Sequence, residues 1–189
     1  MAIIQETVEV DVPVRTAYDQ WTQFEDYPRF MENVEQVQQI DATTLAWRAS
    51  IAGVEKRWQA RITEQVPDRR IAWTSIDGAR NDGTVTFNSE GAHRTRVTLQ
   101  LQVEPDGPVE SAGTALGLVR QSVHGDLQRF REFIEARGLE TDGWRGEIHD
   151  GSEARGTGVQ PSPVATTSGA GRAGGAGDIP GLDSTRTRS

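Results

Sequence analysis

Residues 94–138, RTRVTLQLQVEPDGPVESAGTALGLVRQSVHGDLQRFREFIEARG, contain the two most clearly patterned elements of the chain. In the first ten of them, apolar residues alternate with Arg, Thr and Gln, which predicts a strand with one apolar and one polar face. The Pro- and Gly-containing stretch 105–108 ends this strand, and a long helix is predicted from about 110 to 137, stopped by Gly138. One narrow apolar stripe runs along that helix, formed by Leu116, Val119, Val123, Leu127, Phe130 and Ile134. A strand and a helix of this kind can each bury their apolar side against the other.

The alternating pattern extends towards the N-terminus and predicts a train of strands. Strand patterns occur at 3–12, 34–40, 45–51, 54–63, 71–75 and 85–87. Turn signals between them are Gly53, Pro67-Asp68, Asp77-Gly78 and Asp82-Gly83.

Two short helices with a corner between them are predicted after the first strand, because Pro13 suits a helix start and Pro28 breaks the helical pattern. Strands in one run, with helices segregated from them, indicate an α+β fold rather than a βαβ fold. We therefore expect a curved antiparallel sheet of six to seven strands wrapped around the long C-terminal helix.

Composition excludes several classes of function. The 189-residue chain has no Cys, which excludes disulfides, thiolate metal sites and a cysteine nucleophile. A net charge of −8 argues against a general nucleic-acid partner, and no apolar run approaches the ~18 residues of a transmembrane helix. The three histidines, His93, His124 and His149, are not spaced as metal ligands. We therefore expect no metal and no cofactor. The first residues do not resemble a signal peptide, so we also expect a cytoplasmic protein.

Glycine marks where the folded part ends, because 11 of the 20 Gly lie in residues 140–189. Residues 1–139 are predicted to form the folded domain. Residues 140–150 contain Trp144 and are predicted to dock on it. The Gly-, Ser- and Thr-rich segment 151–189 is predicted to be disordered, and it could recruit a protein partner.

Three segments carry a family resemblance: VDVPVRTAYDQWTQFEDYPRFM (10–31), RIAWTSIDGARNDGTVTF (70–87) and DLQRFREFIEARG (126–138). They resemble the START-like (SRPBCC) superfamily, in particular its polyketide cyclase/dehydrase and coenzyme Q-binding branch. The first is similar to the family's opening strand, Pro-led helix and aromatic F-x-x-Y-P-x-F/W corner, although members often have Asp where this chain has Gln23. The resemblance implies a helix-grip fold over residues 1–139. It also implies a mostly apolar cavity between sheet and long helix, suited to a lipid, quinone or polyketide.

Candidate ligand-binding residues are those whose pattern points towards this cavity: Trp47, Ile51, Lys56, Trp58, Trp73, Ser75, Phe87, Leu99, Leu116, Arg120 and Val123. The three tryptophans could fill the core or stack on a flat ligand. Lys56 and Arg120 are cations at inward positions, and a buried unpaired charge is very costly. They could therefore reach the rim and water, meet a ligand's polar head, or pair with a buried carboxylate such as Glu64. No catalytic residue is assigned, since Ser75 has no evident histidine base nearby in sequence.

Three functions follow from this pattern. The first is binding of a hydrophobic small molecule, as a carrier, chaperone or sequestering protein without chemistry of its own. The second is a polyketide cyclase/dehydratase, which would need a general base that the sequence does not display. The third is an accessory scaffold whose tail recruits a partner.

Overall fold

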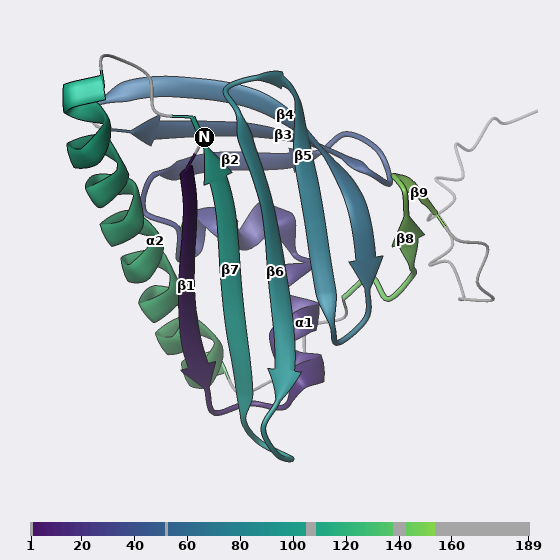
Figure 1. Cartoon of the computed structure of the whole chain (residues 1–189). Helices are drawn as coiled ribbons and strands as arrows, with labels where there is room; N and C mark the ends of the chain where they lie inside the picture. The colour runs from purple at the N-terminus through teal and green to yellow at the C-terminus, as the bar shows by residue number, and fades with distance from the viewer. Residues whose placement is uncertain (1, 52, 105–108, 138–142, 154–189) are drawn as a thin grey trace, which may run out of the picture. The chain divides into compact units, whose positions relative to one another are not determined.

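The computed structural model describes residues 2–51, 53–104, 109–137 and 143–153 (Figure 1), with only the backbone described at 51, 109–112 and 114. Its elements, in chain order, are β1 (Ala2–Val10), α1 (Val14–Trp21), the 3₁₀ helix η1 (Phe24–Arg29), β2 (Val34–Gln39), β3 (Thr44–Ile51), β4 (Val54–Val66), β5 (Arg70–Gly78), β6 (Asn81–Ser89), β7 (Thr95–Val103), α2 (Val109–Arg137), β8 (Ile148–His149) and β9 (Ser152–Glu153). The first three residues of the segment predicted to be disordered, 151–189, are described, and Ser152–Glu153 form β9; the part beyond Glu153 lies outside the described residues.

The described strands form one antiparallel sheet of nine, in which seven follow the order β1-β7-β6-β5-β4-β3-β2, β8 pairs with β4, and β9 pairs with β8. Strand β1 pairs with β7, with Val10 opposite Thr95 and Ala2 opposite Val103. The sheet curves from β1 round to β2, and α2 runs along its concave side next to β1 (Figure 1). The α+β class and the curved sheet around the long helix are thereby confirmed.

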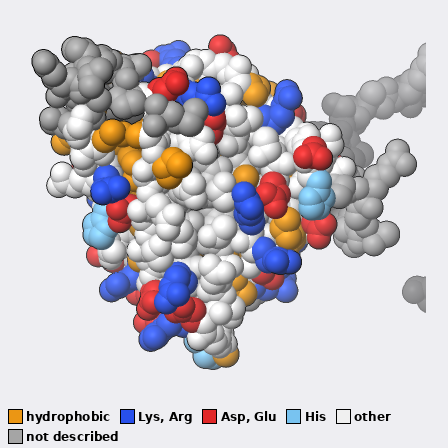
Figure 2. Space-filling model, viewed as in Figure 1, with side chains coloured by type: hydrophobic (Ala, Val, Ile, Leu, Met, Phe, Trp, Pro, Cys, Tyr) orange, Lys and Arg blue, Asp and Glu red, His pale blue; other side chains and the backbone are white. Residues whose placement is uncertain are grey.

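The two faces of the sheet differ as the alternation predicts. On the concave side, the β7 residues Val97 and Leu99 are buried, whereas their neighbours Thr98 and Gln100 lie on the other face. Over β6 and β7, that outer face consists mainly of uncharged polar side chains and backbone, with charged groups towards its borders (Figure 2). Period-two alternation therefore divides the sheet into a core side and a water side.

Aromatic rings fill one part of the space between the sheet and α2. Trp21 is at their centre, in edge-on contact with Tyr27, Phe30 and Phe87, and 5.3 Å from Phe130 of α2 between ring centroids. The Tyr27 hydroxyl also donates to the carbonyl oxygen of Trp21 at 2.7 Å. Such ring pairs are each worth about 0.5–1.5 kcal/mol beyond the area they bury. They fix the aromatic corner of α1 and η1 against the helix.

Strand β4 is 13 residues long, and two different strands pair with successive parts of one of its edges. Strand β3 pairs with it as far as Arg61, and β8 pairs with it at Glu64 and Gln65. Ile148 of β8 is completely buried. The segment after α2 therefore returns to the sheet and continues the ladder where β3 ends.

The interpretation of Asp82-Gly83 as a turn is wrong, because both residues lie inside β6. The chain reverses between β5 and β6 after Gly78, whose φ of +79° favours glycine. A Cβ on Gly83 would lie 2.3 Å from the indole of Trp73, its partner on β5. Gly83 is therefore required by a long-range contact with an aromatic ring rather than by a turn.

Candidate ligand-binding pocket

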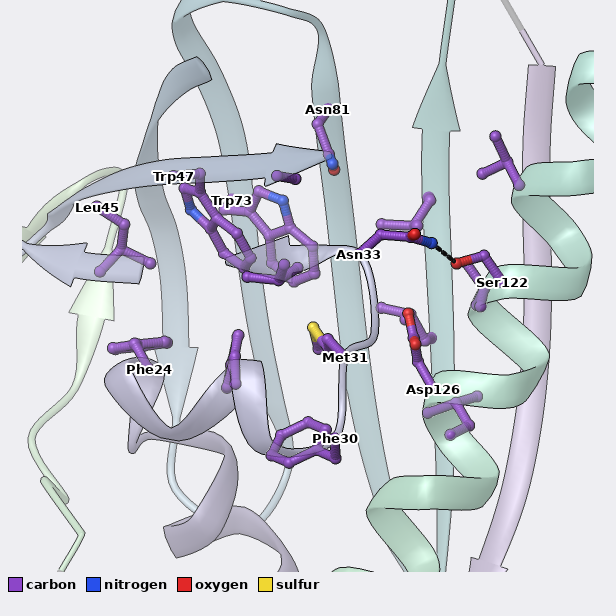
Figure 3. Close-up of a pocket in the computed structure, with 18 of the residues that line it drawn as sticks. Phe24, Phe30, Met31, Asn33, Leu45, Trp47, Trp73, Asn81, Ser122 and Asp126 are labelled. Atoms are coloured by element: carbon purple, nitrogen blue, oxygen red, sulfur yellow. Dashed lines mark hydrogen bonds between the residues drawn. The ribbon is translucent and has the colours of Figure 1, made fainter. Parts of the chain in front are cut away.

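A pocket of about 400 Å³ lies between the concave face of the sheet, the aromatic corner and α2 (Figure 3). It is lined by Trp21, Phe24, Tyr27, Phe30, Met31, Asn33, Val34, Leu45, Trp47, Ala49, Trp58, Ile62, Ile71, Trp73, Asn81, Leu99, Leu101, Ala115, Leu118, Val119, Ser122, Val123, Asp126 and Leu127. All but four of these side chains are apolar or aromatic, the exceptions being the two Asn, the Ser and the Asp.

Helix α2 contributes a regular stripe to the pocket wall. Its lining residues are Ala115, Leu118, Val119, Ser122, Val123, Asp126 and Leu127. Their spacing of three and four residues places them on one face of the helix. Leu118 lines the pocket and is nevertheless 57% exposed, so it stands where the pocket meets the solvent.

Three tryptophans on successive strands form the opposite wall. Trp47 and Trp58 are register partners on β3 and β4, and their rings are stacked with centroids 5.5 Å apart and planes 11° apart. Trp73 on β5 lies over Gly83 of β6, whose missing side chain makes room for the indole. Flat aromatic surfaces of this kind suit a planar apolar molecule.

Polar groups gather where the chain entering β2 faces α2. Asn33 Nδ2 donates to Ser122 Oγ at 2.6 Å, and Figure 3 shows both side chains beside Asp126. Asp126 Oδ1 accepts from the backbone N–H of Glu32 at 3.0 Å and from the guanidinium of Arg129. Burial raises the pKa of Asp126, and these two hydrogen bonds offset that effect only in part.

Arg129 holds the Asp126 carboxylate in place. Its Nε donates to the carbonyl oxygen of Phe30 at 3.0 Å, while another nitrogen of the same guanidinium reaches Asp126. Arg129 therefore joins the helix to the aromatic corner and orients the only carboxylate among the described lining residues.

Of the predicted site residues, Trp47, Trp58, Trp73, Leu99 and Val123 line the pocket together. The structure does not bring the remaining five whose side chains it describes to that wall: Lys56, Ser75, Phe87, Leu116 and Arg120. The side chain of Ile51 lies outside the described residues.

Each predicted residue away from the pocket has its own surroundings. Phe87 is buried beside Tyr18 and Trp21. Ser75 donates to Asp82 Oδ1 at 2.8 Å on the β5–β6 hairpin. Half-buried Lys56 and Leu116 do not reach the lining.

Arg120 is placed outside the pocket as well. Its side chain is 62% exposed, with Nε 3.7 Å from Glu6 on β1. A position at the edge of the apolar stripe keeps the guanidinium in water, where its charge is hydrated, instead of in an apolar cavity.

Sequence reasoning missed the polar lining residues Asn33, Asn81, Ser122 and Asp126. A signal for two of them exists, because Ser122 and Asp126 lie four residues apart along one border of the helical stripe, directly before Val123 and Leu127. Two polar residues along the border of an apolar stripe mark a place where the helix does not contact apolar side chains alone.

Two further properties concern the described residues only. No group of three or more His, Asp or Glu side chains in the described ranges could hold a metal ion. Within the same ranges, no helix is both long enough and apolar enough to cross a membrane.

Comparisons with known proteins agree with this architecture. A family model described as polyketide cyclase / dehydrase and lipid transport matches residues 10–132. An uncharacterized 17.2 kDa protein from the melC2-rnhH intergenic region of Streptomyces lincolnensis is 48% identical over 149 residues, which cover 78% of this chain and 99% of that protein.

Solved structures of the same fold include a START superfamily protein from Mycobacterium smegmatis. It has a TM-score of 0.60 and 15% identity, and the match covers 70% of this chain and 98% of that one. The ZhuI aromatase/cyclase from Streptomyces sp. R1128 has a TM-score of 0.63 and 17% identity, covering 76% of this chain and 99% of that one. At these identities the likeness concerns the fold alone.

Proposed function

Because the chain belongs to the polyketide cyclase/dehydrase and lipid transport family, we propose that it binds a hydrophobic small molecule in the pocket between the sheet and α2. The observation that carries the proposal is the wall of this pocket, which is apolar apart from four side chains. Its volume of about 400 Å³ is in the range typical of small-molecule sites. The ligand class is a lipid, a quinone or a polyketide-like molecule, held as cargo or kept from water.

The stacked Trp47 and Trp58 support a planar ligand in particular. Rigid aromatic walls lose little entropy when a flat molecule enters, and they offer a large contact area. A carrier needs no more than this, since it holds its ligand without changing it.

Extraction of the purified full-length chain with organic solvent, followed by mass spectrometry, tests the proposal. A lipophilic molecule present in stoichiometric amount is the expected result. The variant Val119→Trp places a large ring in the pocket wall and should lose that molecule. Gln121→Trp, an exposed position on the same helix, should retain it. If both variants carry the same molecule in the same amount, the pocket is not where it binds.

A cyclase/dehydratase is the second candidate, and Asp126 is the observation that favours it. Aldol cyclisation of a poly-β-keto chain needs a base that removes a proton from carbon between two carbonyl groups. Asp126 is a carboxylate in the pocket wall with a raised pKa, which suits a general base better than an exposed aspartate does. Conversion of a β-polyketone probe by the wild-type chain, but not by Asp126→Asn, would favour this candidate over the carrier.

A role for the segment 151–189 in recruiting a protein partner stays a prediction. All of this segment after Glu153 lies outside the described residues. A pull-down that compares the full chain with a chain ending near Gly151 would test it.

A further inference from the structure

The polar side of the pocket has two hydrogen-bonding positions left over. Asn33 Nδ2 donates to Ser122 Oγ at 2.6 Å, so the Ser122 hydroxyl proton is not used in that bond. Both hydrogen bonds to the Asp126 carboxylate end on Oδ1, and among the described residues none donates to Oδ2. One donor, the Ser122 O–H, and one acceptor, Asp126 Oδ2, remain side by side.

The two groups are held in a fixed relation to each other. Ser122 and Asp126 are four residues apart on α2, so one lies above the other on the same helix face (Figure 3). Asn33 fixes Ser122 from one side, and the Glu32 amide and Arg129 fix Asp126 from the other. Groups held in this way bind a ligand without a further ordering cost.

A hydroxyl group matches this pair because it donates one hydrogen bond and accepts others. An ammonium group fits less well, since Arg129 already pairs with Asp126 and the remaining wall cannot solvate a cation. A ligand carboxylate would be repelled by Asp126. The chemistry of the wall therefore selects a neutral molecule with an alcohol or phenol group.

We propose that Ser122 and Asp126, positioned by Asn33 and Arg129, form a polar subsite that anchors the hydroxyl of a flat, otherwise apolar alcohol or phenol. The ligand hydroxyl donates to Asp126 Oδ2 and accepts from the Ser122 hydroxyl, while the tryptophan wall holds the apolar body. This inference rests on the proposed function, because it concerns the same pocket. Burial of Asp126 adds support, since a partly desolvated carboxylate gains more from a donor than an exposed one.

Equilibrium dialysis of the full-length chain with two probes of similar size, 2-naphthol and 2-methylnaphthalene, tests the subsite. The wild-type chain should bind 2-naphthol about tenfold more tightly or better, as expected for a hydrogen bond to a charged acceptor. Asp126→Asn keeps an oxygen for the Glu32 amide but removes the charge, and Ser122→Ala removes the donor. Each variant should lower the preference for 2-naphthol several-fold and leave the affinity for 2-methylnaphthalene unchanged. Glu132→Gln, an exposed position on the same helix, should behave as wild type.

The outcomes separate the subsite from the pocket. Equal binding of both probes by the wild-type chain would overturn the subsite and leave the proposed function standing. Binding of neither probe would overturn both. Weakening of both probes to the same extent in Asp126→Asn and in Ser122→Ala would show that these residues only maintain the pocket's shape, and would also overturn the subsite.

Discussion

The indole rings of Trp47 and Trp58 are stacked on neighbouring strands, 11° from parallel, and both contribute to the wall of the pocket. A ligand that enters the pocket should therefore quench their fluorescence. With menadione as a small flat probe, Trp58→Leu should bind about two- to tenfold more weakly, because an aromatic contact is worth about 0.5–1.5 kcal/mol. Trp144→Leu removes a ring that is 40% exposed and not in the wall, so its affinity should equal that of wild type. Equal affinities of all three chains would contradict the prediction.

Gly83→Ala should damage both stability and binding. The added Cβ would lie 2.3 Å from Trp73 and 2.8 Å from Leu101, so the indole must move towards the pocket. Overpacking of this kind costs about 1–3 kcal/mol, measurable by urea denaturation. Gly117→Ala is the matched control, because a Cβ there meets nothing within 4 Å on an exposed helix face. That control should be stabilised slightly, by about 0.5–1 kcal/mol.

Arg145→Ala should destabilise the chain more than Arg15→Ala, although both arginines pair with Asp19. The Asp19 side chain is 3% exposed, and Arg145 is 28% exposed and also bonded to Asp68 at 2.7 Å. Its loss leaves a buried carboxylate short of a partner, at a cost of about 1.5–3 kcal/mol. Arg15 is 56% exposed and 3.6 Å away, so its loss should cost under about 1 kcal/mol. Similar losses in the two variants would contradict this ranking.

The cost of Arg145→Ala should depend on pH. Burial raises the pKa of Asp19 above its usual 3.8, and the charge of Arg145 opposes that rise. Without Arg145 the folded-state pKa of Asp19 rises further, so the folded variant takes up a proton more readily than the unfolded chain does. The difference in unfolding free energy between wild type and variant should thus be largest at neutral pH. It should shrink as the pH falls through the raised pKa of Asp19 towards 3.8. A difference that stays constant or grows over this range would contradict the assignment.

Asp82→Ala tests a carboxyl group whose pKa is lowered in the folded state, whereas the pKa of Asp19 is raised. Burial would raise the pKa of Asp82, but hydrogen bonds from Ser75 and Thr74 and the nearby charge of Arg80 together lower it below 3.8. The folded state therefore favours the carboxylate, so the ionised form of Asp82 stabilises the chain above pH 3.8. That contribution should disappear as the pH falls through the lowered folded-state pKa. Urea denaturation at neutral and acidic pH, with exposed Asp77→Ala as control, measures it.

Much of the fold could be predicted because its signals are local. The alternation in 95–103 indicates which side of a strand is buried, and the stripe from Leu116 to Ile134 indicates which side of a helix is buried. In the structure both of these sides face the core. Asp82-Gly83 shows the limit of such signals. The same dipeptide suits a tight turn or a strand position beneath Trp73, and only the neighbouring strand decides between them.

The site was harder to predict than the core around it. A pocket exists where the side chains of facing elements leave volume unfilled, which depends on several strands and α2 together and not on any one pattern. The stripe on α2 identifies the inward side, yet Arg120 and Ser122 lie at its borders with opposite outcomes. Arg120 reaches Glu6 and water, whereas Ser122 meets Asn33 at the pocket wall. Those partners are distant in the sequence, so helical spacing alone does not distinguish the two residues.

The short strand β8 has a consequence for how copies of this protein behave towards one another. Beyond Arg61, β4 has no β3 neighbour, and its backbone groups are met by Thr43, by β8 and by the amide of Gly151. A chain that ended before Ile148 would leave this stretch of β4 as an open edge with unpaired N–H and C=O groups. Open edges of this kind recruit strands from other molecules. The return of the chain after α2 thus protects the protein from aggregation through its own longest strand.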